Sequence, residues 1–272
     1  MTAGTAFAPR PLPVFRRAVT DTWRSTLVWT LALTAALLLY LPLYPSMNGA
    51  DMRNLIEGLP PELVSALGYA DIFSGPGYVQ GAFFGLLGFV FITIAAVTWG
   101  STAIAGAEES GRLELVLSHG VGRAQYALES ALGLFTRLLW FAVYTTAVIL
   151  ILNGPSQLGL EPVDLLAVEA AWLGLGFLAG SLALAAGAAT GRRSVALGAG
   201  AAAAAYGYVL NALANQDADL AWLRDISPYS WAYRNAPLAE GFDVPGLALL
   251  AAAGAVFTAA AAAALRRRDI LG

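Results

Sequence analysis

The sequence VQGAFFGLLGFVFITIAAVTWGSTAIAGAEESGRLELVLSHGVGR, residues 79–123, joins a long apolar run to a short charged segment. Residues 79–104 contain no charged side chain, and a helix needs only about 20 apolar residues to cross ~30 Å of hydrocarbon. The charges that follow, from Glu108 to Arg123, are costly to place in lipid. The sequence therefore predicts a membrane-spanning helix that ends at an aqueous surface.

The rest of the chain has the same character. Apolar residues make up 58% of the 272 residues and charged residues only 12%, whereas about a quarter of a soluble domain is charged. The alternating polarity of a membrane barrel is absent, so helices must satisfy the backbone in lipid. We predict one all-α polytopic membrane domain over residues 1–272, with six transmembrane helices at about 26–43, 79–104, 131–152, 165–189, 195–213 and 244–265.

The arginines predict how these spans are oriented. All 15 basic residues are arginine, and basic residues concentrate in cytoplasmic loops. With the N-terminus inside, only Arg53, Arg224 and Arg234 lie outside, and the other twelve lie in the cytoplasm. We therefore expect a multi-pass protein of the plasma membrane with both termini cytoplasmic.

Two segments beside the spans are predicted to lie at the membrane surface. Residues 10–24 place apolar side chains at helical spacing with arginines between them, which favours an interfacial amphipathic helix before the first span. A basic flank that only orients the first span is the alternative. Residues 214–243 are rich in aromatic side chains and are interrupted at Pro228. They favour an outer re-entrant or interfacial helical segment before the sixth span, and an aromatic belt at the headgroups is the alternative.

Few charged groups fall within the spans. Arg137 and Glu169 each lie near enough to a span end to snorkel to the surface. Gly176 and Gly180 have the spacing that lets helices approach closely, and we expect them to pack within one subunit rather than across a dimer.

The charged loop between the second and third spans, residues 105–125, is predicted to contain a short amphipathic helix between glycines. Glu108 and Arg112 have the i, i+4 spacing that stabilises a helix by ~0.3 kcal/mol. A helix that lies on anionic lipid usually carries a basic polar face, whereas this segment carries three glutamates. A protein partner explains it better. Its apolar stripe consists of Leu113, Val116 and Leu117.

At this loop the chain resembles the permease subunits of ABC-2 type ABC transporters. Those subunits commonly carry Glu-Glu-x-x-Gly or Glu-Glu-x-Gly, then Thr/Arg-Leu-Glu/Asp-Leu-Leu-Leu, a small residue and Pro-Val-Ser-Arg. Residues 108–118, EESGRLELVLS, fit this pattern, and the tail departs at Gly120 and Gly122, where proline and serine are usual. Softer similarities lie at residues 75–78, 227–229 with 235–238, and 267–270.

The resemblance implies a transport subunit that has no ATPase site of its own. A chain without lysine lacks the P-loop lysine, so ATP and magnesium would bind to a separate ABC ATP-binding subunit, and this chain would need no cofactor or metal. A second permease chain, identical or related, would complete the transporter. The loop would hold the coupling helix, docking on the ATP-binding subunit through Glu108, Glu109, Gly111, Arg112, Leu113, Glu114, Leu117 and Arg123.

The resemblance also implies a substrate. Actinobacterial members of similar sequence are often described as drug or antibiotic exporters, so we expect export of a small hydrophobic or amphipathic compound (a drug, an antibiotic or a lipid-like molecule) through the bilayer. No nucleic acid is expected as a partner. The family places the path at the second and fifth spans, with the candidates Phe83, Phe84, Phe91, Tyr206, Tyr208 and Asn211.

Two alternatives fit the sequence less well. A stand-alone secondary transporter or channel predicts ionisable residues at the midplane or broken helices in inverted repeats. An intramembrane enzyme needs paired aspartates, a Ser/His pair or a metal cluster inside the bilayer. The only histidine, His119, lies in the charged loop.

Overall fold

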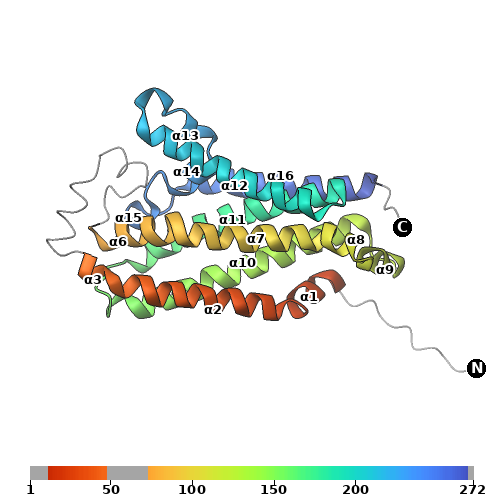
Figure 1. Cartoon of the computed structure of the whole chain (residues 1–272), viewed down its shortest axis with the longest axis horizontal. Helices are drawn as coiled ribbons and strands as arrows, with labels where there is room; N and C mark the ends of the chain where they lie inside the picture. The colour runs from red at the N-terminus through yellow and green to blue at the C-terminus, as the bar shows by residue number, and fades with distance from the viewer. Residues whose placement is uncertain (1–11, 48–72, 269–272) are drawn as a thin grey trace, which may run out of the picture.

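The computed structural model describes residues 12–47 and 73–268, which form helices and their connections (Figure 1). The prediction of an all-α chain with six spans is confirmed, because six of the described helices are long and apolar enough to cross a membrane. Most extend beyond the predicted ends, since apolarity marks only the part of a helix in hydrocarbon. They cover Trp23–Ser46, Gly75–Glu109, Arg123–Asn153, Pro162–Thr190, Arg193–Gln216 and Val244–Arg267.

The N-terminal part contains a short helix and the first span. α1 (Pro13–Thr20) is the helix predicted within residues 10–24, although it ends before Trp23, which begins α2. The first span consists of α2 (Trp23–Tyr40), η1 (Leu41–Leu43) and α3 (Tyr44–Met47).

The second span changes its helical geometry along its length. α6 (Gly75–Tyr78) leads into a π-helix, η2 (Val79–Gly88), which continues as α7 (Phe89–Ser101). A second π-helix, η3 (Thr102–Gly106), then joins α8 (Ala107–Glu109). With two π segments, this span is the most irregular of the six described. The π-helix is rare and occurs mostly as single-turn bulges, frequently at functional sites.

The remaining spans are regular, and short helices connect them. The charged loop forms α9 (Arg112–Ser118), and the third, fourth and fifth spans are α10 (Arg123–Asn153), α11 (Pro162–Thr190) and α12 (Arg193–Gln216). The outer segment contains η4 (Ala218–Leu220), α13 (Leu223–Ile226), α14 (Pro228–Tyr233) and α15 (Pro237–Glu240), and α16 (Val244–Arg267) is the sixth span.

α11 is the central helix of the bundle. Its apolar window is 67% buried, against 17% for the first, fifth and sixth spans. Its glycines allow α7 to approach, because a Cβ added to Gly176 would lie 2.6 Å from Ile92 and one added to Gly180 would lie 2.9 Å from the Ala96 carbonyl oxygen. The expected packing of this glycine pair within one subunit is confirmed.

The helices have two ends of different character. Figure 1 shows α1, α8, α9 and the end of α16 together at one end, and α3, α6 and α15 at the other. The charged loop, the α11–α12 turn and the last arginines of α16 therefore share one end of the bundle, which we call the loop end.

Candidate functional site

Glu108 ties the second span to the sixth. Its carboxylate pairs with the guanidinium of Arg268, and both side chains are mostly buried. Arg123, the first residue of α10, donates from Nη1 to the carbonyl oxygen of Arg268 at 2.7 Å. The start of the third span is thereby attached to the same point.

The expected i, i+4 pair between Glu108 and Arg112 is not formed. The helix stops at Glu109 and restarts at Arg112, because Gly111 adopts a left-handed conformation with φ of 69°. Glycine takes that conformation at little cost. Arg112 is turned away and donates from Nε to the Ser110 hydroxyl at 2.9 Å.

Glu109 ties the same loop to the fifth span. Its carboxylate accepts the backbone N–H of Arg193 at 2.7 Å, and Arg193 is the first residue of α12. The first N–H groups of a helix lack intrahelical acceptors and carry partial positive charge. A carboxylate satisfies both needs, so Glu109 positions the α11–α12 turn.

α9 divides its side chains between the bundle and the outside. Leu113 is fully buried in a cluster with Val14, Tyr126 and Leu265, and Val116 and Leu117 pack against that cluster. Glu114 is exposed, and Leu115 is 63% exposed. Leu115 was absent from the predicted docking residues, because it lies off the apolar stripe that the spacing indicated.

A buried carboxylate holds α1 against the third span. Glu129 of α10 accepts the backbone N–H groups of Val14 at 2.7 Å and Phe15 at 2.9 Å. Ala18 lies so close to α10 that a Cβ added to Gly133 would be 2.8 Å from it. α1 therefore packs on protein along this face. The sequence offered no signal for Glu129 beyond an acid among apolar neighbours.

Removing Glu129 is expected to free α1. Glu129→Ala leaves the N–H groups of Val14 and Phe15 without their acceptor, and each unsatisfied group destabilises the docked α1 by ~1–3 kcal/mol. Trypsin should therefore cleave after Arg16 and Arg17 at least about tenfold faster. Glu129→Gln keeps a carbonyl oxygen and should retain most of the protection. Equal digestion of Glu129→Ala and the unmodified protein would rule out this role.

Reversing Glu108 is expected to loosen the loop end. Glu108→Arg places like charges together, and breaking a pair of intermediate burial costs ~1–3 kcal/mol, which lowers the melting temperature in detergent. The double variant Glu108→Arg with Arg268→Glu should recover most of the loss. Arg267→Glu, at the exposed neighbouring position, is the matched control and should change little. A swap that recovers nothing would contradict the pairing.

The two charges inside the spans do not snorkel, contrary to the expectation from their positions. Arg137 is 8% exposed, and its guanidinium lies 4.9 Å from the centre of the Trp99 ring of α7. Glu169 is 2% exposed and accepts a hydrogen bond from the Thr145 hydroxyl of α10 at 2.6 Å. Both side chains face neighbouring helices, and helix rotation, which sequence position does not fix, decides this.

The outer segment packs on the second and fifth spans. It is helical and interrupted at Pro228, as predicted, with Ser227 between α13 and α14. The Ser227 hydroxyl donates to the carbonyl oxygen of Gly207 on α12 at 2.6 Å. Tyr229 and Tyr233 are buried, so an aromatic belt does not describe them. Burial raises the pKa of both phenols, which therefore remain protonated.

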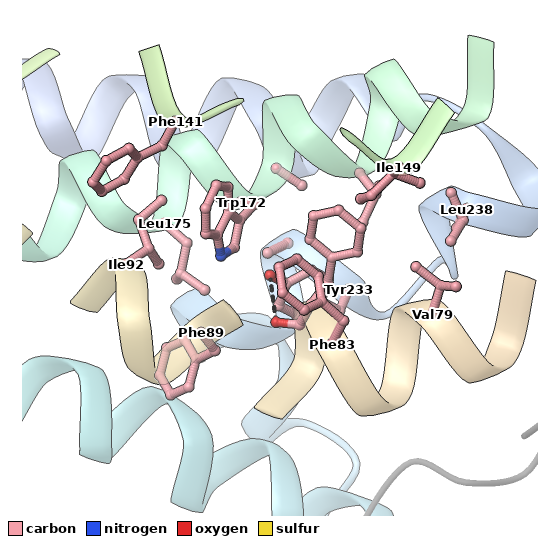
Figure 2. Packing of buried hydrophobic residues seen from close by; sticks show 14 of the residues in the cluster. Val79, Phe83, Phe89, Ile92, Phe141, Ile149, Trp172, Leu175, Tyr233 and Leu238 are labelled. Atoms are coloured by element: carbon pink, nitrogen blue, oxygen red, sulfur yellow. Dashed lines mark hydrogen bonds between the residues drawn. The ribbon is translucent and has the colours of Figure 1, made fainter. Parts of the chain in front are cut away.

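The substrate-path candidates divide into three groups. Phe83 and Phe84 are fully buried and pack against Trp172; Figure 2 shows Phe83 and Trp172 with Tyr233. Tyr208 contacts Phe89 and Tyr229, and Asn211 accepts from the Ser230 hydroxyl at 2.9 Å, so these two lie together beneath the outer segment. The third group lies away from the outer segment, because Phe91 packs on Trp29 and the Tyr206 side chain is exposed.

The cavity at this place is small. It lies among residues of α7, α11, α12 and α14, including Phe89, Leu175, Gly207 and Tyr229, and measures about 10 Å³. Such a volume holds about one water molecule. This cavity is too small for a drug-sized compound, and the six path residues stay predictions.

Six apolar helices, with a short charged helix between the second and third spans, define a multi-pass membrane protein. A family model described as ABC-2 family transporter protein matches residues 12–270. The chain belongs to this family, as its loop motif indicated, and is the membrane component of an ABC transporter rather than a catalytic subunit. Comparison with curated proteins gave no match.

Proposed function

We propose that this chain exports a small amphipathic compound and that α9 receives the ATP-binding subunit that drives it. The observation that carries the docking part of the proposal is Leu115, a large apolar side chain that is 63% exposed on a short helix next to an exposed glutamate. Covering an exposed leucine side chain with a partner contributes roughly 1.5–3 kcal/mol. The docking surface is Arg112, Glu114, Leu115, Ser118 and His119, all exposed.

The charge distribution supports a cytoplasmic position for this surface. The arginines of α1, the α11–α12 turn and the end of α16 all belong to the loop end. Basic residues mark the cytoplasmic side of membrane proteins, and ATP-binding subunits require cytoplasmic ATP. Both termini would then be cytoplasmic, with the outer segment on the opposite side.

The contacts of the loop end provide a route for movement. A push on α9 reaches the second span through α8, the fifth span through Glu109 and Arg193, and the sixth span through Glu108 and Arg268. Of the predicted docking residues, Glu108, Glu109, Leu113 and Arg123 therefore transmit the movement, while Arg112 and Glu114 belong to the contact surface. The second and fifth spans are the pair that must separate to admit substrate.

Reconstitution tests the proposed function. The chain is co-purified with a candidate ABC ATP-binding subunit and placed in vesicles with a fluorescent amphipathic cation as the transported probe. We expect ATP hydrolysis to drive the probe away from the side that binds the ATP-binding subunit. Equal movement without ATP would favour a secondary transporter, and failure of the two subunits to associate would contradict the proposal.

A further inference from the structure

The π-helix η2 needs support from outside the helix. In π geometry each N–H bonds five residues back instead of four, and such segments are usually a single turn. η2 covers ten residues, Val79–Gly88. Neighbouring structure must therefore favour this geometry over a continuous α-helix.

The outer segment provides this support through two tyrosine hydroxyls. Tyr233 donates to the carbonyl oxygen of Phe84 at 3.1 Å, and Tyr229 donates to that of Gly85 at 2.8 Å. The two tyrosines are four residues apart on α14, so they share one face of that helix. One helix face thus supplies hydrogen bonds to two successive carbonyl groups of the π-helix.

Two further features fit the same contact. The Gln80 side-chain oxygen accepts the backbone N–H of Leu238, so η2 is also tied to α15 at 2.9 Å. A Cβ on Gly85 would lie 3.0 Å from the Tyr229 hydroxyl and 3.1 Å from the Gln80 carbonyl oxygen. Glycine at position 85 therefore leaves the room that the Tyr229 hydroxyl occupies.

We propose that Tyr229 and Tyr233 are positioning residues that hold the second span in its π register. When they withdraw, η2 relaxes to an α-helix, and each residue of register change turns one part of the span by ~100° relative to the other. Phe83 and Phe84 then leave their present packing. Only the link from this rotation to the substrate path rests on the proposed function.

Cysteine labelling tests the register directly, because the chain has no cysteine. Single cysteines replace Ala82, Leu86 or Leu87 in the purified permease, and their reaction with a water-soluble maleimide is timed. In the Tyr229→Phe, Tyr233→Phe background we expect at least one position to change its rate by about fivefold or more, as loss of a hydrogen bond predicts. Unchanged rates at all three positions would overturn the proposal.

Matched variants separate register from general damage. Tyr208→Phe removes a hydroxyl from the same aromatic cluster, one with no hydrogen bond among the described residues, and should leave the labelling pattern unchanged. Gly85→Ala keeps both phenols but crowds Tyr229, and should reproduce the changed pattern. If the double variant does not fold, the labelling rates are measured in the Tyr233→Phe single variant. The same fivefold change supports the proposal, and unchanged rates overturn it.

The labelling requires neither nucleotide nor the ATP-binding subunit. Unchanged labelling together with intact ATP-driven transport would defeat this inference and leave the proposed function standing. Changed labelling in a chain that never transports would defeat the proposed function and leave the register control standing.

Discussion

Gly100→Ala is expected to prevent normal assembly of the bundle. A Cβ at Gly100 would lie 2.1 Å from the carbonyl oxygen of Gly180 on α11, where backbone meets backbone. No side chain can rotate to relieve that contact, so the cost should reach or exceed the ~3 kcal/mol upper range of ordinary overpacking. Size-exclusion profiles and melting temperatures in detergent measure it, and we expect an aggregated or strongly destabilised protein.

Gly198→Ala is the matched control for this prediction. Gly198 lies on an exposed face of α12, and an added Cβ there meets nothing within 4 Å. The substitution should stabilise α12 slightly, because alanine has a higher helix propensity than glycine. A Gly100→Ala protein that melts at the unmodified temperature would show that α7 and α11 do not cross as described.

Leu115→Asp is expected to abolish the stimulation of ATP hydrolysis in the partner subunit. The side chain is largely exposed, so the permease should fold and melt normally. Covering a leucine side chain contributes ~2 kcal/mol, and the affinity for the ATP-binding subunit should therefore fall about 30-fold or more. Titration of the ATP-binding subunit against the reconstituted permease gives both the affinity and the stimulated rate.

Leu115→Met is the conservative partner of this variant. Methionine keeps an apolar side chain of similar size, so most of the affinity should survive. If the Leu115→Asp permease binds the ATP-binding subunit with normal affinity, α9 is not part of the interface.

Hydropathy and charge predicted the six spans because both depend on composition along one segment. The charged loop was found for the same reason, and helical spacing placed Leu113, Val116 and Leu117 on one stripe. That this stripe packs on the bundle was not predicted, because Leu113 and Leu117 were assigned to docking. The six path residues came from family resemblance, and the fold shows only where each one lies. The actual ends of the spans were missed where helices continue past their apolar part.

Long-range pairing could not be predicted from one sequence. Spacing along the helix predicted that Glu108 pairs with Arg112, four residues away. The actual partner of Glu108 is Arg268, 160 residues away. Glu129 reaches α1 across 115 residues. The rotation of each helix about its own axis could not be predicted either. It turns the side chains of Arg137 and Glu169 toward other helices, so the prediction that they snorkel was wrong. The π register of η2 depends on α14, which only the folded bundle brings beside it.

Crosslinking from position 115 tests the central claim most directly. Leu115→Cys in the otherwise cysteine-free chain carries a short photoactivated crosslinker, and the assembled complex is illuminated in vesicles. We predict a crosslink to the ATP-binding subunit from position 115 and none from Leu249→Cys, which is exposed on α16. Capture of only lipid from position 115, with the complex intact, would contradict the assignment of α9 as the helix that receives the ATP-binding subunit.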